Sequence, residues 1–194
     1  MTEDSLTARF ACYADLKPLQ IQCDPTIPQD ALDVIYSRKL LPVVGLEAGA
    51  QTAVSSAAPI IGAAGITITL AVCPPGQGPQ LHAHKATYET FTVLQGTFEF
   101  RWGESGEHAR RLGRFDTFSV PPRVHRAFRN VGDVEGILQV VISGGKHDAR
   151  DIYIPAAVME NLKSKSAKLY EQLTASGISS EVPPPSLSMP TSTT

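Results

Sequence analysis

The residues best suited to chemistry lie in one segment, GQGPQLHAHKATYETFTVLQG at 76–96. His82 and His84 are two positions apart, so on a β-strand both imidazoles point to the same face. Glu89 begins the next apolar run, and a tight reversal of the chain would bring its carboxylate back toward the two histidines. Two neutral imidazoles and one carboxylate are a common ligand set for a divalent first-row metal, and non-haem Fe(II) oxygenases use this set with open positions. The segment therefore predicts a metal site at His82, His84 and Glu89.

The spacing of these residues resembles the first motif of the cupin superfamily. That motif is a glycine, five residues, His-x-His, four residues, a glutamate, six residues and a second glycine. The chain matches every position, with Gly76, His82, His84, Glu89 and Gly96. The resemblance implies an all-β fold, the cupin double-stranded β-helix or jelly-roll barrel. It also implies a divalent transition metal as cofactor, for which iron, nickel, manganese and zinc all stay open.

A second segment, FDTFSVPPRVHRAFRN at 115–130, resembles the second cupin motif but departs from it. Four residues stand where the family has them: Asp116, Pro121, Phe128 and Asn130. Phe115 and Arg123 replace the two glycines of the motif. Arg126 occupies the position of its histidine, and the chain has a histidine, His125, one residue earlier.

The choice between His125 and Arg126 depends on the register of this strand. A regular register would point Arg126 inward together with Phe128 and turn His125 outward, whereas a bulge near Pro122–Arg123 would turn His125 inward. We expect His125 as the fourth ligand, because a buried arginine beside a cation is costly without a partner. If Arg126 did point inward, it would bind a substrate carboxylate rather than a metal.

Aromatic residues alternate with polar ones along the same strands and favour an inward-facing apolar wall. In a jelly roll the inward face also lines the cavity, so we expect a substrate pocket there. Its predicted residues are Phe91, Phe100, Trp102, Arg126 and Phe128. The remaining histidines, His108 in a polar loop and His147 after the last strand, are expected to be exposed.

Short β-branched or aromatic runs between turn signals predict strands from 41 to about 143. The candidates are 41–46, 65–72, 88–95, 97–102, 115–120, 124–130 and 134–143. A short helix is predicted within 30–40, and helical spacing of apolar residues predicts one amphipathic helix over about 156–174. We therefore expect an N-terminal arm at 1–35, a cupin β-barrel domain at 36–150, a C-terminal helix at 151–177 and a disordered tail at 178–194.

The composition excludes several classes of protein. The chain has 194 residues, which predicts one domain, and a net charge of −2 without a basic stripe, which argues against nucleic-acid binding. Its three cysteines have no CxxC spacing and predict neither a disulfide framework nor a thiolate zinc site. The most apolar stretch, 57–72, is too short and too interrupted to span a bilayer, and the N-terminus lacks the apolar core of a signal peptide. We expect a cytoplasmic protein without a membrane partner.

The ligand set and the resemblance to the cupin superfamily predict a mononuclear metal-dependent dioxygenase. Its substrate would be a small organic molecule, for which an aromatic compound stays open. Similar single-domain cupins include dioxygenases but also isomerases, lyases and decarboxylases, so the reaction and any further catalytic residue stay open. The alternatives are a cupin isomerase or lyase and a non-catalytic module that binds a small molecule, which the irregular second motif supports. The resemblance also implies a homodimer.

Overall fold

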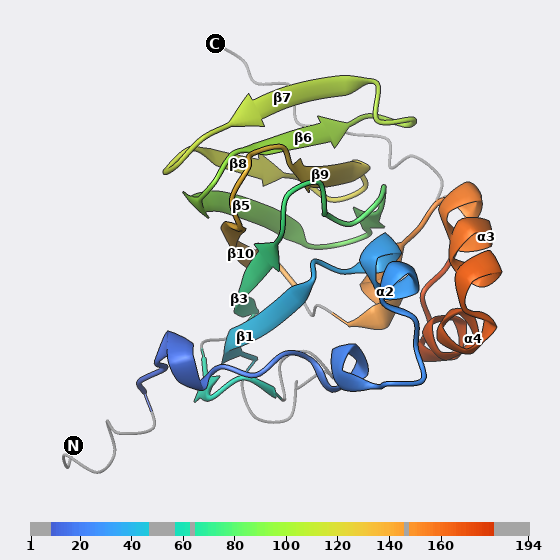
Figure 1. Ribbon diagram of the computed structural model, residues 1–194, viewed down its shortest axis with the longest axis horizontal. Helices are drawn as coiled ribbons and strands as arrows, with labels where there is room; N and C mark the ends of the chain where they lie inside the picture. The colour runs from blue at the N-terminus through green and yellow to red at the C-terminus, as the bar shows by residue number, and fades with distance from the viewer. Residues whose placement is uncertain (1–8, 47–56, 63–64, 146–147, 181–194) are drawn as a thin grey trace.

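Two β-sheets form the centre of the molecule in the computed structural model, which describes residues 9–46, 57–62, 65–145 and 148–180 (Figure 1). The larger sheet has the strand order β2-β1-β3-β10-β5-β8. Its strands are β1 (Lys39–Gly45), β2 (Ile60–Ile61), β3 (Ile66–Cys73), β5 (Tyr88–Gln95), β8 (Thr117–Val120) and β10 (Gly136–Ser143). The smaller sheet, in the order β7-β6-β9, contains β6 (Phe98–Trp102), β7 (His108–Leu112) and β9 (Arg126–Asn130). Two short strands, β4 (Ala83–His84) and β11 (Ile152–Tyr153), pair separately.

The larger sheet buries one face, as the alternation of its sequence requires. Along β5, Glu89, Phe91 and Val93 are buried while the residues between them are partly or fully exposed, because successive side chains point to opposite faces. The buried side packs against the smaller sheet around a cluster of phenylalanine rings. Ring centroids in this cluster lie 5.2 Å apart for Phe91 and Phe100 and 5.2 Å apart for Phe91 and Phe128.

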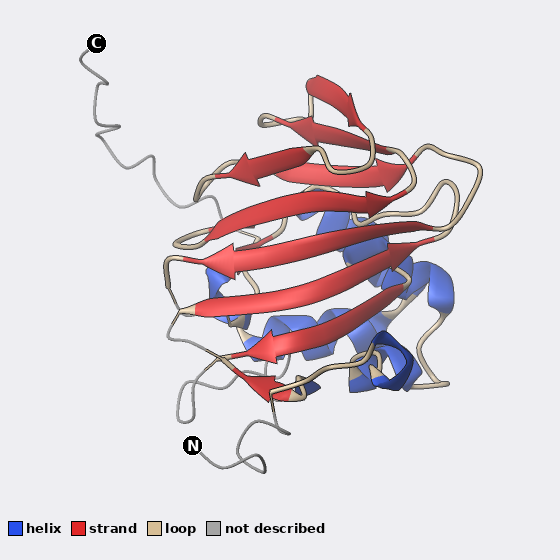
Figure 2. Cartoon of the chain, turned by 90° about the vertical axis from the view of Figure 1, so that its left-hand side faces the viewer, coloured by secondary structure: helices blue, strands red, loops and turns tan. Residues whose placement is uncertain are grey.

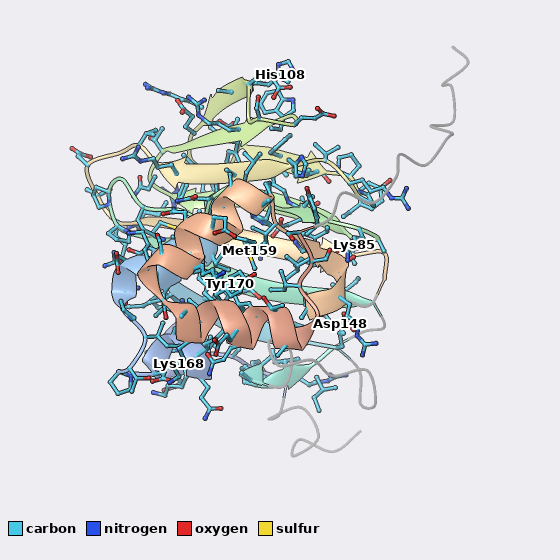
Figure 3. All side chains as sticks on the ribbon, turned by 90° about the vertical axis from the view of Figure 1, so that its right-hand side faces the viewer. Lys85, His108, Asp148, Met159, Lys168 and Tyr170 are labelled. Carbon is cyan, nitrogen blue, oxygen red and sulfur yellow. The ribbon has the colours of Figure 1, made fainter. Side chains whose placement is uncertain are left out.

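Three helices lie together on one side of the sheets (Figures 1 and 3). They are α2 (Gln29–Ile35), α3 (Ala156–Lys165) and α4 (Ala167–Ser176). The face of the larger sheet seen in Figure 2 has the helices behind it. Apolar residues of the three helices and of the segments beside them form a second core, separate from the core between the sheets. We call this group of helices and adjoining segments, residues 27–36 and 152–178, the helical cap.

The arrangement of strands agrees with the expected double-stranded β-helix, but the described strands form separate sheets instead of one closed barrel. All seven strands expected from the sequence are present, as β1, β3, β5, β6, β8, β9 and β10. The polar loop expected around His108 is instead the strand β7. β7 is an edge strand that pairs with β6 alone, and only its last residue is buried. Its sequence therefore lacks the apolar alternation that marks the other strands.

The single helix expected over 156–174 is two helices. Ser166 has an extended backbone, with φ of −155°, and ends α3. Its hydroxyl accepts a hydrogen bond of 3.2 Å from the Leu169 amide, which caps the N-terminus of α4. Beyond α4, Ile178 is buried and Ser179 pairs with Tyr153, so the chain expected to be a tail is still packed there. The rest of that expected tail, 181–194, and His147 lie outside the described residues.

The turns of both motif segments use left-handed backbone. Gly76 and Gly96 have φ values of +79° and +85°, which glycine adopts without steric cost. Phe115 and Arg123 have φ values of +72° and +69° although they carry side chains. The turns of the second motif therefore keep the backbone of a glycine at both positions where the glycine is replaced.

Across the residues that the structure describes, no helix has the length and apolar character needed to cross a membrane.

Candidate metal centre

Three side chains converge where β4 and β5 begin. His84 belongs to β4, His82 precedes it, and Glu89 is the second residue of β5. The Nε2 atoms of both histidines lie 3.7 Å from the same carboxylate oxygen, Oε2 of Glu89. One donor atom from each of the three residues lies within 4.8 Å of the other two, so the group could hold a metal ion.

Hydrogen bonds fix both imidazole rings with Nε2 toward this centre. Nδ1 of His82 lies 2.9 Å from the Gln80 carbonyl oxygen, which can only accept a hydrogen bond. Nδ1 of His84 lies 3.0 Å from Oδ2 of Asp151. Because both Nδ1 atoms donate in a neutral ring, both Nε2 atoms carry the lone pair that a metal ligand requires.

Asp151 is a residue that the sequence did not indicate. It ends a short 3-10 turn, Ala149–Asp151, and its buried carboxylate also accepts hydrogen bonds from the Ala86 amide at 2.8 Å and the Thr87 hydroxyl at 2.6 Å. A carboxylate behind a ligating histidine orients the ring and increases its basicity. No local pattern marks this role, since only the pairing of β11 with β4 brings Asp151 to His84.

Arg126, not His125, points toward the centre. The backbone amide and carbonyl of Arg126 both pair with His82, at 2.8 and 3.0 Å, so the strand keeps a regular register without a bulge. The Arg126 side chain is fully buried, and its Nε donates to Oε2 of Glu89 at 2.8 Å. His125 instead packs its ring against Tyr153, with centroids 5.1 Å apart. The expectation of His125 as fourth ligand is therefore corrected, because Glu89 supplies the partner that a buried arginine needs.

Glu89 is ionised in this arrangement. Burial by itself raises the pKa of its carboxyl group, but the charge of Arg126, the largest opposing cause, outweighs burial and holds that pKa well below its usual range. A carboxylate has two oxygens and about four lone-pair sites, so Glu89 can accept from Arg126 and still offer a lone pair to an ion.

A cavity of about 120 Å³ opens beside the centre, and His82, His84 and Glu89 form part of its wall. Among the five residues expected to line a substrate pocket, only Phe128 lines this cavity. Phe91 is buried in the core between the sheets, and Arg126 is held by Glu89. Phe100 and Trp102 border a different cavity beside Phe118, at the junction of β6, β7 and β8. The expected aromatic wall is therefore corrected to a largely aliphatic one, because the phenylalanine rings pack on one another in the core.

Residues 69–143, which contain the three converging side chains and Arg126, match the family model described as cupin domain. These residues form a cupin domain. No curated protein matches the chain.

The chain is also similar to solved structures. These include the cupin domain of Cnp3 from Schizosaccharomyces pombe (18% identity, TM-score 0.39, covering 42% of this chain and 57% of that one). Another is an uncharacterized conserved protein with a double-stranded β-helix domain from Klebsiella pneumoniae (23% identity, TM-score 0.40, covering 43% and 71%). A third is a predicted oxalate decarboxylase from Thermotoga maritima (19% identity, TM-score 0.38, covering 41% and 66%). At such TM-scores none of them carries an argument about function.

The cupin domain fits a metal ion with three protein ligands. The donor set is two imidazole nitrogens and one ionised carboxylate, which suits a divalent first-row metal. Arg126 occupies the position where the cupin motif has a further histidine, so the ion would keep more open positions than with four protein ligands.

Proposed function

We propose that this cupin protein is a mononuclear metal-dependent oxygenase of small organic molecules, with His82, His84 and Glu89 as its metal ligands. The observation that carries the proposal is the convergence of the three donors on the wall of a cavity, within 4.8 Å of one another. Two histidines and one carboxylate with open positions are the ligand set of non-haem Fe(II) oxygenases.

Each nearby residue has a distinct part in this proposal. The Gln80 carbonyl and Asp151 hold the imidazoles in place, and Arg126 holds the Glu89 carboxylate. The apolar cavity excludes water and positions the substrate. The metal, when bound, supplies redox chemistry toward dioxygen.

A metal-free binding module is the second candidate, and the Arg126–Glu89 pair favours it. The guanidinium neutralises the carboxylate at 2.8 Å without any metal, so the buried centre is already balanced in charge. In that case the cavity would bind a small molecule without converting it.

Metal analysis of natively purified protein, combined with oxygen uptake, separates the two functions. We expect about one iron, nickel or manganese ion per chain, and a content reduced at least tenfold in His82→Ala and His84→Ala. His108→Ala, an exposed histidine on β7, is the matched control and should keep the metal. Protein that contains only zinc and takes up no oxygen with any organic substrate would exclude the oxygenase and favour the binding module.

A further inference from the structure

The cavity beside the metal centre has a predominantly aliphatic wall. Its apolar side chains come from α2, from β10 and from the C-terminal part of the helical cap: Val34, Ile35, Val140, Ile142, Ile154 and Ile178. Its volume of about 120 Å³ is several times what one water molecule needs, so a small organic molecule fits. A ligand there would exchange most of its contact with water for contact with hydrocarbon.

The charges around this cavity do not suit an ionic ligand. Glu89 is the only lysine, arginine, aspartate or glutamate in the cavity wall, and Arg126 already pairs with it. A carboxylate or ammonium group entering the cavity would lose its hydration without gaining an opposite charge, which is costly. Arg126 pairs with Glu89 through Nε and does not line the cavity, so it does not offer its charge to a ligand there.

Three hydroxyl groups supply polarity without charge. Tyr36, Ser37 and Thr69 all line the cavity, and the Ser37 hydroxyl is buried without a hydrogen-bond partner among the described residues. Burial raises the pKa of Tyr36 to about 12, so its hydroxyl keeps its proton near neutral pH. A buried hydroxyl without an acceptor is unfavourable, and an oxygen atom of the ligand would relieve this.

We propose that the cavity binds a small uncharged molecule with an aliphatic or alicyclic body and one or two carbonyl or hydroxyl oxygens, which pair with hydroxyls of Tyr36, Ser37 and Thr69. This inference rests on the proposed function only where it identifies that molecule as the substrate. Binding itself requires the cavity and its hydroxyls, not the metal.

Calorimetric titration of the full chain with three probes of one shape tests the proposal. The probes are cyclohexanone, cyclohexanecarboxylate and cyclohexylammonium at pH 7, each with and without a chelator. We expect cyclohexanone to bind at least ten times more tightly than either ion, in both conditions. A carboxylate or ammonium probe that binds as tightly as the ketone would overturn the proposal, and so would the absence of binding by all three at millimolar concentration.

Variants locate the binding. Tyr36→Phe removes only the hydroxyl and should weaken cyclohexanone binding about three- to tenfold, whereas Tyr170→Phe on α4 should leave it unchanged. Val140→Phe should fill the cavity and abolish binding, while Val141→Phe, the next residue of β10 with its side chain on the opposite face, should not. Full ketone affinity in both Tyr36→Phe and Val140→Phe would contradict the site.

The metal content of the same samples separates this inference from the proposed function. Ketone binding by natively purified protein that contains no transition metal would leave the inference standing and remove the oxygenase. Protein that contains the metal but does not bind the ketone would leave the oxygenase standing and remove the inference.

Discussion

At the scale of single residues, the Arg126–Glu89 pair is the main difference between this cupin domain and the cupin motif. A buried ion pair needs good geometry to compensate for the hydration that both charges lose. Here Nε donates at 2.8 Å to the same oxygen that faces both histidines, and Nη1 donates to the Val124 carbonyl at 3.2 Å. The arginine thus holds in place the carboxylate that we propose as a metal ligand.

Arg126→Ala should therefore destabilise the protein by about 3–5 kcal/mol, because it leaves the Glu89 charge buried without its partner. Added Co²⁺ should restore part of this loss, since the ion would supply the missing positive charge. Urea unfolding with and without Co²⁺ measures both effects.

Arg129→Ala is the matched control, because Arg129 belongs to the same strand but is exposed and bonds only to the Gly76 carbonyl. Its unfolding free energy should change by about 1 kcal/mol or less. Equal stability of Arg126→Ala and the native protein would show that the Arg126–Glu89 pair contributes nothing to the free energy of unfolding.

The candidate site was predictable from sequence where its residues are close along the chain. The spacing of His82, His84 and Glu89 predicted three donors on one face, and the structure brings these three together. The role of Asp151 was not predictable, because it depends on a contact with His84 across 67 positions of the chain. The inward position of Arg126 was not predictable either, because its partner Glu89 lies 37 positions away on another strand.

At the scale of elements, the turn at Phe115 has the left-handed backbone that suits glycine, although the residue there is phenylalanine. A left-handed conformation costs a residue with a side chain roughly 1–2 kcal/mol compared with glycine. Phe115 is 68% exposed, and the Arg114 guanidinium lies 4.5 Å from the centre of its ring. That contact offsets only part of the backbone cost, because an exposed cation–π pair contributes about 0.5–1 kcal/mol.

Phe115→Gly should be more stable than Phe115→Ala by about 1 kcal/mol. Both variants lose the ring and its contact with Arg114, so the difference in stability between them reports the cost of the backbone conformation alone. Thermal unfolding of the two variants side by side measures it. If alanine is the more stable of the two, then the turn does not keep its positive φ in solution.

The elements also show what periodicity can and cannot predict. The seven expected strands were recognisable because one buried face imposes an apolar alternation, whereas β7 lacks such a face. The break between α3 and α4 was missed for a different reason. Buried Leu162, Ser166, Leu169 and Leu173 continue the helical spacing across it, so only the capping hydrogen bond of Ser166 reveals two helices.

At the scale of the whole molecule, the cavity lies between two separate cores. Phe128 and Val140 belong to the core between the sheets, while Val34, Ile154 and Ile178 belong to the helical cap. Asp151 joins the two parts, since it precedes β11 and accepts a hydrogen bond from His84. Docking of the cap and binding of a metal at His84 should therefore stabilise each other.

Asp151→Ala should lower the affinity for Co²⁺ about 10- to 100-fold, because His84 loses the acceptor that orients its ring. In the native protein Co²⁺ should also slow amide hydrogen exchange in α3, and this effect should be smaller in Asp151→Ala. Asp116→Ala, which removes a hydrogen bond to Gly113 in a distant turn, is the control. Native Co²⁺ affinity in Asp151→Ala would show that the cap and the metal centre are independent.

The two-part construction of the cap has a consequence for biosynthesis. Its first part, residues 27–36, leaves the ribosome well before its second part, residues 152–178, and the delay is roughly 6 to 23 seconds at ordinary rates of translation. In the later part of that interval the segment that carries His82, His84 and Glu89 is already complete, but Asp151 and the isoleucines that the cap contributes to the cavity have not yet been synthesised. The nascent chain therefore passes through a stage in which its metal ligands face water, and this stage is the natural moment for an ion to enter.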